Sequence, residues 1–213
     1  MLSGTTRQIL PVVNDSSLMY VALQSKTSGA TNYDYVGTNL VYTASTGILS
    51  IAGTIATTNL YVGGNLSNNG TTNLIGTSSS VAAVLANAVE TTTISATPAT
   101  GTINFDITTQ SVLYYTSNAT ANWTVNFRAS SGTLLNTAMS TGQSLTATFL
   151  STQGATAYYN STVKVDGNSI TPKWQGGTAP SAGNASGVDI YVYTIVKTGN
   201  AAFTIFASQT QFK

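Results

Sequence analysis

The chain contains no cysteine and no histidine, and charged residues make up only 6% of its 213 residues. Without these two residue types, thiol nucleophiles, disulfides and histidine-based catalytic triads are excluded. Seven basic and six acidic side chains leave a formal net charge of +1, which offers no basic surface for the phosphate backbone of nucleic acids. We therefore expect no nucleic-acid partner.

Long apolar runs are also missing. No stretch approaches the roughly 18 consecutive apolar residues of a membrane-spanning helix, so we expect no membrane insertion. The polar surface must come mainly from neutral Thr, Ser, Asn and Gln, which stay hydrated without repulsion between identical copies. Thr favours strands, whereas Ser, Asn and Gly favour turns. The composition therefore predicts an all-β protein that tolerates self-association.

The few carboxylates are scattered along the chain, at Asp15, Asp34, Glu90, Asp106, Asp166 and Asp189. A glycosidase needs two carboxyls placed across the scissile bond. Folding could bring Asp106 and Asp189 together, but turn or solvent-facing positions explain both residues better. No Asp-x-Asp-x-Asp run supplies clustered calcium ligands. We therefore predict that the chain is not an enzyme and that it holds no metal and no cofactor.

The N-terminal part of the chain divides into two stretches of different texture. Residues 1–42 hold two apolar segments, 8–13 (QILPVV) and 18–23 (LMYVAL), around a turn-forming NDSS sequence, and we interpret them as a docking region. Residues 43–80 contain short apolar segments closed by Gly or Asn-Gly turns. Such a ribbon cannot enclose its own apolar face and needs neighbouring copies. It predicts a short β-repeat shaft or collar formed by three chains.

Residues 81–100 form a predicted linker. Val81, Val84, Leu85 and Val89 recur at helical spacing, which favours a short helix. An extended apolar strand or linker explains the same residues, because spacing alone does not separate the two at this length. Both alternatives stay open on sequence alone.

Residues 101–213 carry the clearest period-two alternation of apolar and polar side chains. It runs through the segments 103–107 (INFDI), 122–128 (NWTVNFR) and 145–149 (LTATF). Alternation of this kind places one face of a strand on a core and the other in water. The segments 112–115 (VLYY) and 190–196 (IYVYTIV) are mostly apolar on both faces, which predicts strands buried on both sides.

Turn signals join these segments. Asp166-Gly167 and Gly199-Asn200 each separate two strand-like segments, and these residue types accept the positive φ of two-residue hairpin turns. Seven or more short strands with closely spaced turns predict a C-terminal antiparallel β-sandwich of jelly-roll-like type over residues 101–213. The predicted fold class is therefore all-β, with an N-terminal β-strand or shaft-like region ahead of the sandwich.

Three aromatic residues form the candidate ligand-binding set. Tyr158, Tyr159 and Trp174 lie outside the cleanest alternating strands, and an aromatic face beside amide groups can stack on a sugar. A host surface glycan would then be the ligand. The alternative is that Trp123 and Trp174 anchor the core, because each tryptophan buries a large apolar area.

Several segments of the C-terminal part share one resemblance: 110–116 (QSVLYYT), 122–128 (NWTVNFR), 139–144 (MSTGQS), 157–159 (AYY), 165–167 (VDG), 171–177 (TPKWQGG), 195–199 (IVKTG) and 208–212 (SQTQF). In this order they resemble a domain of virion structural proteins from marine phages, including cyanophages. The stretch 43–80 is also similar to phage fibre and tailspike shafts. The resemblance implies a virion component that docks on other capsid or tail proteins and displays its C-terminal β-domain outward.

Composition and resemblance together predict a non-enzymatic phage virion structural protein. We expect a homotrimeric short fibre or knob displayed for host attachment, since multivalent display strengthens weak single contacts. A capsid decoration (cement) protein that stabilises the shell is one alternative, and copy number per particle separates the two. A carbohydrate-binding module is the second alternative, which glycan binding by the soluble protein would test.

Overall fold

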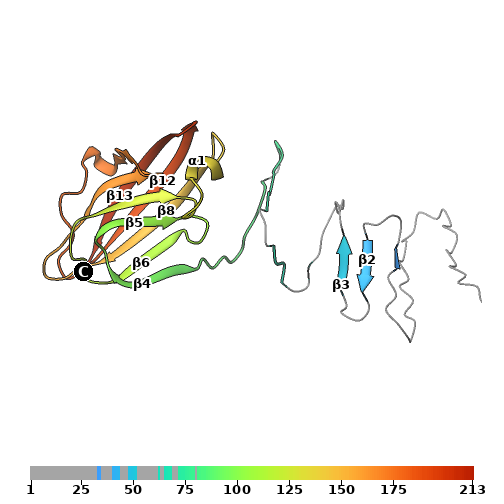
Figure 1. Cartoon of the computed structure of the whole chain (residues 1–213), viewed down its shortest axis with the longest axis horizontal. Helices are drawn as coiled ribbons and strands as arrows, with labels where there is room; N and C mark the ends of the chain where they lie inside the picture. Colours follow the sequence, from blue (N-terminus) through green and yellow to red (C-terminus); the bar gives the residue numbers. More distant parts are fainter. Residues whose placement is uncertain are drawn as a thin grey trace, which may run out of the picture. The chain divides into compact units, whose positions relative to one another are not determined.

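The computed structural model describes the C-terminal part of the chain continuously and the N-terminal part in pieces (Figure 1). The described residues are 33–34, 40–43, 48–51, 62, 65–68, 72–79 and 81–213. Most of the predicted docking region, 1–42, and much of the predicted shaft or collar, 43–80, therefore lie outside them. Both assignments stay predictions.

The chain divides into two compact units, Met1–Leu74 and Ile75–Lys213. In the first unit, β1 (Tyr33–Asp34), β2 (Leu40–Thr43) and β3 (Ile48–Ile51) form an antiparallel sheet with the order β1-β2-β3. This unit thus contains short strands, in keeping with its Gly- and Asn-punctuated sequence.

The second unit holds two sheets around one core. Its elements are β4 (Thr92–Pro98), β5 (Gly101–Asp106), β6 (Val112–Ser117), β7 (Trp123–Arg128), α1 (Leu135–Ala138), β8 (Ser144–Thr152), β9 (Asn160–Val165), β10 (Asn168–Ile170), β11 (Lys173–Trp174), η1 (Gln175–Gly177), β12 (Val188–Gly199) and β13 (Ala202–Phe212). The six-stranded sheet has the order β11-β13-β12-β8-β6-β4, and the four-stranded sheet has the order β10-β9-β7-β5. The prediction of a mostly β protein with a two-sheet C-terminal domain is confirmed.

From β4 to β9 the chain alternates between the two sheets. As a result β4, β6 and β8 are parallel neighbours in one sheet, and β5, β7 and β9 are parallel neighbours in the other. The chain therefore winds through both layers like a short β-roll. The long antiparallel hairpin β12–β13 then pairs with β8 and completes the larger sheet.

The predicted antiparallel, jelly-roll-like topology is wrong, because the sandwich mixes parallel and antiparallel pairs. Period-two alternation reports which face of a strand is buried and is the same for either direction of pairing. The two predicted hairpins are confirmed, at the β9–β10 turn and the β12–β13 turn. Asp166 and Gly167 have φ of 50° and 82°, the positive values that a two-residue turn requires.

The predicted linker, 81–100, contains two different structures. Residues 81–91 form no helix, so the helical alternative is wrong there. Residues 92–98 form β4, the edge strand of the six-stranded sheet. The sandwich therefore begins before residue 101, because the polar, β-branched sequence TTISAT pairs in parallel register with β6.

Aromatic side chains fill the space between the sheets. Trp123 is 1% exposed, and its ring meets Phe149 and Tyr191 at centroid distances of 5.7 and 5.8 Å. Phe127 meets Tyr193 edge-on at 5.0 Å. Pairs of this geometry contribute about 0.5–1.5 kcal/mol beyond their buried area. The interpretation of Trp123 as a core anchor is confirmed.

The predicted burial of both faces is wrong for the two mostly apolar strands. In β12, Tyr191, Tyr193 and Ile195 are buried, whereas the alternate residues are only half-buried. In β6, Leu113 is buried and Tyr114 is half-buried. The outer face of the sheet has no covering layer within the described residues of the chain.

Among those residues, none belongs to a helix with the length and apolarity of a membrane span.

Candidate functional site

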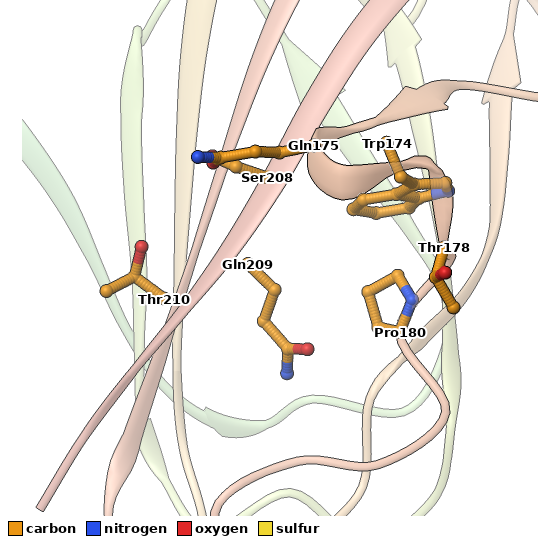
Figure 2. A pocket seen from close by; sticks show the side chains of 7 residues that line it. All are labelled: Trp174, Gln175, Thr178, Pro180, Ser208, Gln209 and Thr210. Carbon is orange, nitrogen blue, oxygen red and sulfur yellow. The ribbon is translucent and has the colours of Figure 1, made fainter.

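A shallow hollow of about 350 Å³ lies on the second unit where β11 runs beside β13. Seven residues line it: Trp174, Gln175, Thr178, Pro180, Ser208, Gln209 and Thr210 (Figure 2). The parallel pairing of β11 with β13 sets Trp174 opposite Ala207. Because β11 is only two residues long, it leaves the following part of β13 unpaired along that edge. The hollow forms at this open edge.

Trp174 supplies the aromatic wall of the hollow. Its indole packs edge-on against Tyr193, with ring centroids 6.3 Å apart, and the residue is only partly buried. In Figure 2 the indole lies beside Pro180, and Gln209 faces them across the hollow. The core therefore holds one part of the ring in place and leaves another part accessible.

Gln209 connects the hollow to the core. Its Nε2 donates hydrogen bonds to the carbonyl oxygen of Ala182 at 3.0 Å and to the hydroxyl of Tyr191 at 2.9 Å. Burial raises the pKa of the Tyr191 phenol, which therefore stays protonated at neutral pH. The amide of Gln209 is thus fixed from two sides, as preorganised ligand contacts require.

The chain turns sharply next to Trp174. Gly176 and Gly177 have φ of 75° and 79°, values that L side chains rarely adopt. These two glycines let the chain leave β11 and pass over Thr178 and Pro180, which close the hollow. The Trp-Gln-Gly-Gly sequence is the one local signal that could have marked this turn.

The structure brings Trp174 into the hollow but not the two tyrosines. Tyr158 is half-buried against the core, and its backbone N–H and C=O both bond to the side chain of Gln153. Tyr159 is held by a hydrogen bond from its N–H to Oδ1 of Asn122. Neither tyrosine lines the hollow, so Trp174 alone of the three candidate residues belongs to it.

The two carboxylates considered for catalysis lie in different environments. Asp106 pairs with Arg128 on the outer face of the four-stranded sheet, where both side chains are partly exposed. Asp189 is fully buried and accepts hydrogen bonds from Gln153 Nε2 and from the N–H of Asn184. Burial raises the pKa of Asp189. The fold therefore does not bring these two carboxylates to a shared cleft.

Comparison with known protein families, curated proteins and solved structures gives no match to this chain. Within the part of the chain that the structure describes, no three His, Cys, Asp or Glu side chains are grouped so as to hold a metal ion.

The hollow itself combines an aromatic ring, two amides and three hydroxyls, and its seven lining residues include no charged group. This chemistry suits a neutral, hydroxyl-rich ligand such as a sugar.

Proposed function

We propose that this chain is a non-enzymatic structural protein of a phage particle. In this proposal it forms a homotrimeric short fibre or knob, docked on capsid or tail proteins, with its C-terminal sandwich displayed for attachment to a host glycan. The resemblance of residues 110–212 to marine phage virion proteins supports the virion setting. The low charge of the chain supports assembly from identical copies.

The observation that carries the proposal is a run of exposed apolar side chains just ahead of the sandwich. Their exposed fractions are 87% for Ile75, 75% for Val81, 85% for Val84, 77% for Leu85 and 99% for Val89. Burying one such side chain contributes roughly 1.5–3 kcal/mol. Five of them offset a large part of the association cost, which is about 4–15 kcal/mol. A structural subunit that packs against its own copies explains why they are exposed in one chain.

The hollow beside Trp174 supports the adhesive part of the proposal. A single shallow site binds weakly, because it leaves much of a ligand in contact with water. Three copies on one particle raise the effective concentration, so that weak single contacts add up to firm attachment. The same hollow also favours the alternative of a carbohydrate-binding module that acts outside any particle.

Immunogold electron microscopy separates these functions. An antibody against the purified chain is applied to intact particles of the phage whose genome encodes it. We expect labelling at tail or fibre positions and a native mass of three chains for the purified protein. Labelling over the whole capsid, with hundreds of copies, would instead identify a decoration protein. Unlabelled particles, with the chain absent from their protein content, would overturn the virion proposal.

A further inference from the structure

The two sheets of the sandwich present outer faces that differ in charge and in apolar content. On the four-stranded sheet, the outward positions of the paired strands β5, β7 and β9 are polar: Thr102, Asn104, Asp106, Thr124, Asn126, Arg128, Thr162 and Lys164. This face includes the Asp106–Arg128 ion pair. It is the kind of surface that a sheet turns toward water.

The outer face of the six-stranded sheet carries an apolar row among uncharged polar side chains such as Thr146, Thr194 and Thr204. Ile190 is the register partner of Leu150, Leu150 is the partner of Tyr114, and Tyr114 is the partner of Ile94. The row therefore crosses four neighbouring strands, β12, β8, β6 and β4. Val192 and Val112 flank it on the same face, both paired with Thr148. Across this sheet, Lys173 at the far edge is the one charged residue at an outward position.

This row explains why sequence patterning predicts burial of both faces for the strands around Tyr114 and Ile190. Strands that are apolar on both sides are normally covered on both sides. Here the inner side covers the core, while Ile94 on the outer side is 65% exposed and the rest of the row is only half-buried. Within the described residues, no second layer covers this outer side.

We infer that the outer face of the six-stranded sheet is the surface through which copies of this chain bind one another. The exposed run described above lies close to this face along the chain, because it ends at Val89, shortly before β4, the edge strand that carries Ile94. Both unpartnered apolar surfaces belong to the same chain, so a second copy can cover them together. Uncharged faces also meet their own copies without like-charge repulsion. In the proposed homotrimer, the three copies of this face would pack around the threefold axis, each sheet against its two neighbours.

This inference rests on the proposed self-assembly and adds the surface that performs it. The test is the full-length Leu150→Lys variant, which puts a charge in the middle of the row. Thr124→Lys is the matched control, because it adds the same charge to the centre of the polar outer face of the other sheet. Native mass spectrometry and sedimentation measure assembly, and circular dichroism checks that each variant folds.

We expect Leu150→Lys to weaken self-association about a hundredfold or more, because a buried unpaired charge is costly, while Thr124→Lys assembles like the wild type. If Leu150→Lys fails to fold, Ile94→Lys decides, since that side chain is already largely exposed. Unchanged assembly of the folded row variants would overturn the inference, as would a monomeric wild type. A monomeric wild type found in particles would leave the virion role intact and mean that another virion protein covers the face. Assembly through this face in a chain absent from particles would overturn the virion role alone.

Discussion

The carboxylate of Asp166 holds the start of helix α1, where its Oδ1 accepts a hydrogen bond from the N–H of Leu135 at 2.7 Å. Its Oδ2 accepts a second one from the N–H of Asn136 at 2.9 Å. The first N–H groups of a helix have no partner within the helix. A residue in a distant hairpin turn therefore supplies the cap that α1 lacks locally, since Leu134 at its N-cap makes no side-chain bond.

We predict that Asp166→Gly lowers the free energy of unfolding by about 1–2 kcal/mol, because both N–H groups lose their acceptor. Glycine tolerates the φ of 50° at this position, so the variant tests the hydrogen bonds rather than the turn. Asp166→Asn keeps one side-chain oxygen and should lose less. Urea unfolding measures both variants, and equal stability of Asp166→Gly and wild type would contradict the role of the cap.

A second prediction concerns the dependence of stability on pH. Burial raises the pKa of Asp189 above its ordinary value, although hydrogen bonds from Asn184 and Gln153 oppose the shift. Between the unfolded and the folded pKa, the folded state binds more protons. The contribution of this group is therefore full at pH values below its unfolded pKa and is lost as pH rises through the folded pKa.

The Asp189→Asn variant cannot ionise, so its free energy of unfolding should decline less over the range from about pH 4 to about pH 7. Urea unfolding at several pH values measures the free energy of unfolding of the variant and of the wild type. The contributions of the other titrating groups cancel in the difference between the two. Parallel pH curves for the two proteins would show that burial of Asp189 does not shift its titration.

The third prediction separates the two roles of tryptophan. Trp174→Ala should leave the chain folded, because the residue is partly exposed at the sheet edge, but should weaken binding of a neutral oligosaccharide about tenfold or more. Trp123→Ala should destabilise the fold by about 3–5 kcal/mol, because that residue is 1% exposed. A glycan array followed by calorimetry measures binding. Tyr159→Ala is the control outside the hollow; loss of binding in it, with Trp174→Ala unaffected, would move the site to the tyrosines.

The sequence predicts which side chains face the core better than it predicts how strands pair. Phe105, Val125 and Phe127 are all buried as their alternation indicates. The direction of pairing depends on where each connection leads. Gly101, with φ of 59°, sends the chain from one sheet into the other instead of into a hairpin. The same turn residues can precede a hairpin or a crossover to the other sheet, so the sequence pattern does not predict the parallel pairing of the strands.

The candidate site is predictable only in part for a related reason. The sequence indicates Trp174 as a candidate because it is an aromatic residue outside the alternating strands. Gln209 and Thr210, which also line the hollow, lie in β13, far along the chain. Pairing between β11 and β13 brings them together, and no local pattern encodes that contact. The sequence indicates Tyr158 and Tyr159 for the same reason. Their backbone N–H groups, however, donate hydrogen bonds to Gln153 and Asn122, and neither residue lines the hollow.

The last prediction uses two glycines with different surroundings. A Cβ atom at Gly183 would lie 2.2 Å from the carbonyl oxygen of Tyr158 and 2.6 Å from Oδ2 of Asp189, whereas one at Gly132 would meet nothing within 4 Å. The atoms around Gly183 are a backbone carbonyl that accepts a hydrogen bond from Gln153 Nε2 and a buried carboxylate that accepts bonds from Gln153 and Asn184. Moving either group would break such a bond. Gly183→Ala should therefore lower the free energy of unfolding by about 2–4 kcal/mol. Gly132→Ala should change the free energy of unfolding by less than about 1 kcal/mol. Any change should be an increase, because alanine has less conformational freedom than glycine in the unfolded chain. Urea unfolding compares the two variants, and similar stabilities would mean that the chain around Gly183 yields more easily than its contacts imply.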